Sequence, residues 1–89
     1  MTNKERELAA VAAGRKYWIE IAEGEDFEYC EGEPCWYVME RFDERPDGWY
    51  NVDAIWSYSG KGGNGPLDFE TEADAQAVAD KMNAGWRGE

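Results

Sequence analysis

The chain has no histidine and only two cysteines among its 89 residues. Without histidine it lacks the commonest general base and the commonest metal ligand, so an enzyme is not expected. No apolar run approaches the roughly 20 residues that span a bilayer, and no apolar stretch follows residues 1–7 as it would in a secretory signal. We therefore expect a cytoplasmic protein without a cofactor.

Branched aliphatic residues and phenylalanine are also scarce. Leu, Ile, Val and Phe together make up only 12 of 89 residues, a composition that on its own is typical of disordered chains. Five Trp, five Tyr and three Met oppose that interpretation, because each aromatic ring buries a large area. The composition predicts one small domain, residues 1–89, with a largely aromatic core.

Basic residues are few. Nine Lys and Arg stand against 20 Asp and Glu, which gives a formal net charge of -11. Direct binding to nucleic acid or to an anionic membrane is not expected, because both need Lys and Arg to neutralise phosphate. The natural partner is a basic protein or a divalent cation, unless the acidity serves only solubility.

Two helices are predicted near the ends of the chain. The first runs from Thr2 to Ala13 and starts with a capping box between Thr2 and Glu5. The second has Thr71 as its N-cap and stops near Gly85. Its apolar stripe consists of Ala75, Val78, Ala79 and Met82.

Three strands are predicted between the helices, over Lys16–Ala22, Cys35–Phe42 and Trp49–Tyr58. The last two are joined by a turn around Pro46 and Gly48 and should pair antiparallel. The third strand has the clearest period of two, and we expect its buried face to consist of Tyr50, Val52, Ala54, Trp56 and Tyr58.

Two segments lack periodicity, residues 23–34 and 60–66. The glycine-rich 60–66 does not match the spacing of a phosphate-binding loop and is predicted to be a flexible connector. The order helix, strand, strand, strand, helix predicts an α+β domain. In it, a three-stranded antiparallel sheet carries both helices on one face.

Acidic residues are segregated along the chain. Between Tyr17 and Glu40 there are eight acids and no Lys or Arg. In extended backbone, residues i and i+2 stand about 6.6 Å apart, so carboxylates two residues apart would form an evenly spaced row. A nucleic-acid strand is also an even row of anions, at about 3.4 Å of axis per charge. We expect like charge to raise the pKa of these crowded carboxylates.

Acidic residues at the turn after the second strand would extend this row, and we expect an exposed Trp49 beside them. The predicted partner-binding residues are Glu20, Glu23, Glu25, Asp26, Glu28, Glu31, Glu33, Asp43, Glu44, Asp47 and Trp49. Asp68, Glu70, Glu72 and Asp74 are a further candidate extension, although acids in a first helical turn also simply complement the helix dipole.

Other uses of these residues are less well supported. The loop pattern of a helix–loop–helix calcium site is missing. Cys30 and Cys35 supply too few ligands for a zinc site within one chain. Their spacing permits a disulfide, but reduced thiols are the expectation for a cytosolic protein. The tryptophans are expected mainly in the core or in a dimer interface, with Trp49 the most exposed.

In length, charge and segregated carboxylates, with acids concentrated over Glu20–Glu33 and Asp43–Asp47, the chain resembles phage-encoded and plasmid-encoded inhibitors that mimic nucleic acid. Anti-CRISPR proteins, anti-restriction proteins and the uracil-DNA glycosylase inhibitor belong to this class, which shares no motif. The resemblance implies a stoichiometric inhibitor that acts in the bacterial host cell. It would block the basic groove of a nucleic-acid-binding defence effector.

The rival hypothesis is a small phage or bacterial scaffold module. Its aromatic surface would dock one partner or a second copy of itself, and its acidity would serve only solubility. Ionic strength separates the two hypotheses. A complex held by carboxylates weakens steeply as salt rises, whereas an aromatic interface changes little.

Overall fold

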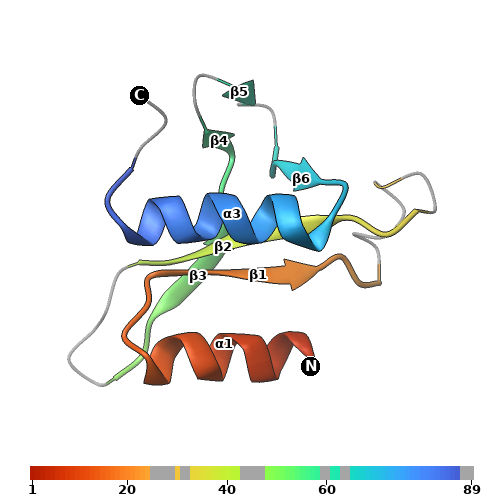
Figure 1. Ribbon diagram of the computed structural model, residues 1–89. Coiled ribbons are helices and arrows are strands. Elements are labelled where there is room, and N and C mark those ends of the chain that lie inside the picture. Colours follow the sequence, from red (N-terminus) through yellow and green to blue (C-terminus); the bar gives the residue numbers. More distant parts are fainter. Residues whose placement is uncertain (25–29, 31–32, 43–47, 59–60, 63–64, 87–89) are drawn as a thin grey trace.

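The computed structural model describes residues 1–24, 30, 33–42, 48–58, 61–62 and 65–86 (Figure 1). Its elements are α1 (Asn3–Ala12), β1 (Tyr17–Ile21), β2 (Trp36–Phe42), β3 (Asn51–Ala54), β4 (Ser57–Tyr58), β5 (Lys61–Gly62), β6 (Asp68–Phe69) and α3 (Glu72–Asn83). In the described parts of the chain, no helix is long and apolar enough to cross a membrane.

The main sheet is antiparallel and has the order β1-β2-β3, with β6 also paired to β2. β3 pairs with Met39–Phe42, and β6 pairs with Trp36 and Tyr37, so the two share one edge of β2. The predicted α+β class is confirmed. The sheet has one strand more than predicted, and a separate β4-β5 hairpin stands in part of the expected connector 60–66.

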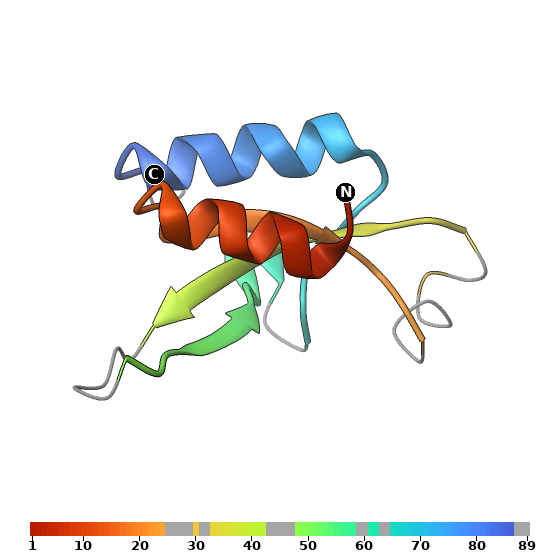
Figure 2. The same cartoon turned by 90° about the horizontal axis from the view of Figure 1, so that it is seen from below.

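Both helices lie on the same side of the strands, as predicted (Figure 2). α3 packs over β1 and β2, and α1 lies alongside β1. The core comprises Tyr17, Ile19, Val38, Ile55, Ala75, Val78, Ala79 and Met82. The predicted apolar stripe of α3 is therefore the part of that helix that is buried.

The predicted helix caps are present. The Thr2 hydroxyl accepts the Glu5 N–H at 3.1 Å, and the Glu5 carboxylate accepts the Thr2 N–H at 3.1 Å. The Thr71 hydroxyl accepts the Asp74 N–H at 3.1 Å. These bonds satisfy donors that a helix leaves unpaired in its first turn.

Two asparagines cap the outer edge of β1. The Asn83 amide accepts the Tyr17 N–H at 3.0 Å and donates to the Tyr17 carbonyl at 2.9 Å. The Asn3 amide does the same at Ile21, with both distances 2.9 Å. A carboxamide carries one donor and one acceptor side by side, so it can replace a missing strand partner at one residue. These contacts anchor the start of α1 and the end of α3 to β1.

The predicted buried face of the third strand is wrong at Val52 and Trp56, although Tyr58 of that face packs against the core. Trp56 is 48% exposed and Val52 37%, whereas Ile55 is only 7% exposed. The strand is interrupted at residues 55 and 56. There the Ile55 N–H donates to the Val38 carbonyl at 2.9 Å, and the Ile55 side chain joins the core under α3.

The expected role of the tryptophans is confirmed only in part. Trp18 is buried, while Trp36 and Trp86 are partly buried and pack against the core. Trp49 is exposed as predicted, with 66% of its surface accessible. The core is thus less aromatic than composition suggested, because alanines of α3 let that helix approach the sheet closely.

Ile55→Ala should destabilise the domain by about 2–5 kcal/mol, because it leaves a cavity beside Val38. Trp56→Ala should cost about 1 kcal/mol or less, since half of that side chain is in solvent. Chemical denaturation of the two variants measures both values. A larger loss for Trp56→Ala would show that the third strand is turned the other way.

Asn83→Asp should destabilise the domain by about 1–3 kcal/mol. The carboxylate still accepts the Tyr17 N–H but sets an anion against the Tyr17 carbonyl, which loses its donor. Urea denaturation measures the loss, with Asn64→Asp as the variant that adds the same charge elsewhere. Equal stability of the two variants would contradict the edge-capping role.

Candidate functional site

The predicted partner-binding residues divide into two groups. Glu20, Glu23, Glu33 and Trp49 are described by the structure. The other seven, Glu25, Asp26, Glu28, Glu31, Asp43, Glu44 and Asp47, lie outside the described residues. The site is therefore built from the described acids.

Glu33 lies with two acids that are distant in sequence. Glu33, Asp68 and Glu70 line one surface hollow together with Pro34, Thr71 and the disulfide between Cys30 and Cys35. The pairing of β6 with the start of β2 brings residues 68–71 beside residues 33–35. The candidate extension of the acidic row to Asp68 and Glu70 is thus supported by position.

Glu23 stands at the same end of the sheet. It follows Ala22, whose N–H donates to the Cys35 carbonyl at 2.9 Å. Figure 1 shows the end of β1, the start of β2, β6 and the start of α3 at this end. We call the exposed acids Glu23, Glu33, Asp68 and Glu70 the acidic end.

The expectation of reduced thiols is contradicted by the structure. Cys30 and Cys35 form a disulfide, with their Cα atoms 5.9 Å apart. The chain turns back here, because the Glu33 N–H donates to the Cys30 carbonyl at 3.1 Å. The spacing of the two cysteines permits this turn but does not require it. The bridged Cys30 and Cys35 both line the hollow together with Glu33.

Most Lys and Arg side chains whose contacts the structure describes interact with residues outside the acidic end. Arg41 lies 5.6 Å from the ring centre of Tyr50, and Lys81 lies 5.4 Å from that of Trp86. Lys4 pairs with Glu7 at 2.9 Å, and Lys16 pairs with Glu40 at 3.6 Å. Glu40, one of the eight segregated acids, thus has a base partner that its sequence neighbourhood did not reveal.

Among the described Lys and Arg residues, Arg6 contacts the first turn of α3. It lies 3.4 Å from the Glu72 carboxylate and 4.9 Å from the ring centre of Trp36. Among the residues that the structure describes, no ion pair reaches the four carboxylates of the acidic end. Their charge therefore remains directed to solvent.

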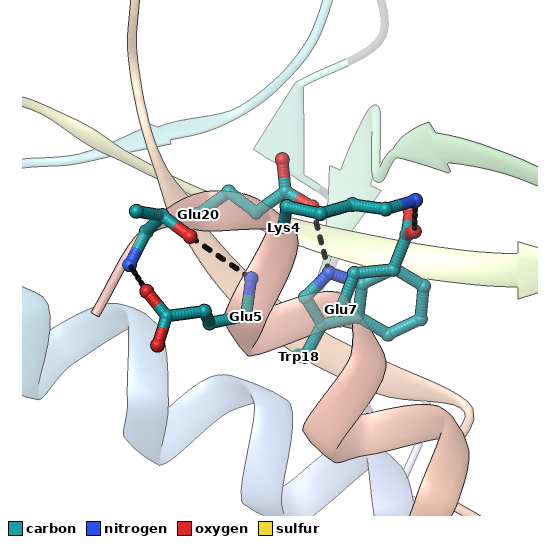
Figure 3. A network of polar contacts seen from close by, with 6 residues as sticks. Lys4, Glu5, Glu7, Trp18 and Glu20 are labelled. Carbon is teal, nitrogen blue, oxygen red and sulfur yellow. Dashed lines mark hydrogen bonds and ion pairs between the residues drawn. The ribbon is translucent and has the colours of Figure 1, made fainter.

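The carboxylate of Glu20 is less available to a binding partner than predicted. Its carboxylate accepts the indole N–H of buried Trp18 at 2.8 Å. Figure 3 shows this pair beside Lys4 and Glu7 of α1. Burial raises the pKa of Glu20, and the nearby charges of Glu7 and Glu23 add to that effect against the opposing Trp18 hydrogen bond. The expected direction is confirmed, but burial is the first cause.

Glu20 also lines a second hollow with Glu23 and Asp53, over Tyr37 and Met39. Carboxylates thus stand at the rim of two neighbouring depressions. In the described segments, no group of three potential ligands is close enough to hold a metal ion.

Comparison of the sequence with protein-family models, curated proteins and solved structures found no match.

Glu20→Gln and Glu5→Gln should change the pH dependence of stability in opposite directions. The pKa of Glu20 is raised on folding, so its contribution improves as pH falls through that pKa. Hydrogen bonds from Thr2 lower the pKa of Glu5, so its contribution is present at neutral pH and lost in acid.

Melting temperatures of both variants between pH 7 and pH 3 test this prediction. At pH 7, Glu20→Gln should melt at or above the parent, because the amide oxygen still accepts the Trp18 N–H without a buried charge. Glu5→Gln should melt below it. Both differences should shrink in acid, and differences that stay constant with pH would contradict the assignment.

Proposed function

We propose that this protein is a non-enzymatic, acidic inhibitor that mimics nucleic acid. Its acidic end would occupy the phosphate-binding groove of a basic nucleic-acid-binding protein, such as a bacterial defence effector of the kind that anti-CRISPR proteins block. It would act in the bacterial cytoplasm as a stoichiometric binder and would bind no nucleic acid itself.

The observation that carries the proposal is the segregation of charge in space. Glu23, Glu33, Asp68 and Glu70 are exposed at one end of the sheet. Glu23 follows β1, Glu33 precedes β2, and the pairing of β6 with β2 brings Asp68 and Glu70 beside Glu33. Lys4, Arg6, Lys16, Arg41 and Lys81 lie against rings or pair with acids of α1, α3 and β2. The four carboxylates of the acidic end, in a chain of net charge -11, are thus exposed where they can meet a cationic surface.

Such a surface acts mainly on the rate of association. Long-range attraction steers oppositely charged proteins together, and its contribution falls as salt screens it. A groove that grips phosphates with Arg and Lys accepts carboxylates through the same charge-assisted hydrogen bonds. The chemistry of the acidic end therefore supports a basic, phosphate-binding protein as the class of partner.

The alternative is a protein-binding or scaffold module with an aromatic surface. Trp49, Val52, Trp56 and Phe42 are exposed on or beside β2 and β3. Exposed rings of this size are enriched in interfaces, including those between copies of one chain. Such an interface would form with little dependence on salt, and a homodimer would be detected by sedimentation equilibrium.

The Glu33→Gln, Glu70→Gln double variant should slow association with the basic partner at least several-fold at low salt. It removes two charges from the acidic end while keeping the size of the side chains. The partner is first identified by capture from a bacterial lysate at low salt, and stopped-flow kinetics then measure the rate.

The matched control is the Glu7→Gln, Asp80→Asn double variant, which removes two charges from α1 and from a later turn of α3. Its association rate should change much less. If both double variants slow association equally, only net charge matters and the acidic end is not the contact surface. An association rate that is insensitive to salt would favour the aromatic module instead.

A further inference from the structure

A third surface hollow lies at the opposite end of the sheet, where β1 begins and β2 ends. Its volume is about 480 Å³, and its walls include Lys16, Glu40, Phe42, Asp53, Trp56 and Met82. None of these residues belongs to the acidic end. The hollow combines exposed aromatic rings with carboxylates and thus differs in its chemistry from the acidic end.

The two aromatic residues are unusually exposed for apolar side chains. Phe42 is 41% exposed and Trp56 is 48% exposed. Neither is required to fill the core, which is closed by Ile55 and Val38 on the helix side. The face of an aromatic ring carries partial negative charge and attracts cations, most strongly for Trp.

Glu40 and Asp53 face each other across the pair of strands. They are direct partners in the register of β2 and β3. Like charges at opposite positions of an antiparallel pair destabilise it. Glu40 is engaged by Lys16 at 3.6 Å and by the Tyr17 hydroxyl, which donates to it at 2.7 Å. Asp53 accepts the Ala54 N–H at 2.8 Å, and no ion pair of Asp53 occurs within the described residues. The local charge therefore stays negative beside two exposed rings.

The hollow already holds one cation of the chain. The Lys16 ammonium group lies near Glu40 and 5.7 Å from the ring centre of Tyr17. The same combination of ring and cation recurs in this small domain at Trp36, Tyr50 and Trp86. In the part of the chain described here, no cation lies over Phe42 or Trp56.

We infer that this hollow binds an arginine side chain of a partner protein, between Trp56 and Phe42 and against Asp53 and Glu40. Arginine fits better than lysine because its planar guanidinium stacks on rings and donates two parallel hydrogen bonds to a carboxylate. This contact goes beyond the proposed function and does not depend on it, since it uses the other end of the domain.

The probe for the test is acetyl-arginine methylamide, followed through the indole N–H signal of Trp56 in NMR spectra of the labelled protein. The control probe is the citrulline analogue, which has nearly the same shape but no charge. Arginine should shift the Trp56 signal saturably, and citrulline should shift it several-fold less. Equal responses to the two probes would overturn the inference.

Variants locate the binding site. Asp53→Asn should weaken binding of the probe about two- to five-fold, as expected for one partly exposed charge contact. Lys16→Gln should strengthen it, because the competing internal cation is gone. Trp49→Ala, which removes the other strongly exposed tryptophan, should leave the affinity unchanged.

Trp56→Ala removes the reporter signal, so its binding is followed through the backbone amide of Ser57. Weakening by Trp56→Ala but not by Trp49→Ala supports the hollow. Equal effects of the two, or arginine-induced shifts confined to Glu33, Asp68 and Glu70, would place binding elsewhere and overturn the inference. Neither outcome bears on the association kinetics that test the acidic end.

Discussion

The outer edge of β1 is the constraint on which the rest of the domain depends. Among the described residues no strand pairs with that side, and two carboxamides from opposite ends of the chain cap it at Tyr17 and Ile21. Unpaired edges invite association with other chains, and this capping leaves fewer unpaired backbone groups there. Because Asn83 lies at the end of α3, the bonds to Tyr17 fix that helix along the sheet. The first turn of α3, and β6 before it, are thereby held beside the start of β2.

The distribution of charge follows from this geometry. Lysine and arginine side chains lie over aromatic rings or beside acids of α1, α3 and β2. Few cations then remain to neutralise the segments that β6 and the disulfide bring together. Self-repulsion among exposed carboxylates costs the folded state some stability. That cost is consistent with the proposed role, since a basic partner would relieve it on binding.

Local signals in the sequence predicted local structure well. The capping residues Thr2 and Thr71 and the apolar stripe of α3 determine both helices, because each signal acts within one or two turns. The prediction of the buried face of the third strand was wrong for a physical reason. A period of two identifies the two faces of a strand but not which of them a helix will cover. The break at Ile55 and Trp56 and the pairing of β6 depend on tertiary contacts. For the same reason, the proximity of Glu33 to Asp68 and Glu70 could not be predicted from spacing.

The two ends of the sheet offer different kinds of recognition. Exposed carboxylates such as those of the acidic end act over about a Debye length and favour fast encounter with any cationic surface. Rings and carboxylates around one hollow act only at contact, where stacking and paired hydrogen bonds distinguish one side chain from another. A basic groove that displays many arginines could meet both. In that arrangement the acidic end would set the rate of association, while the hollow beside Trp56 would select the orientation of the complex.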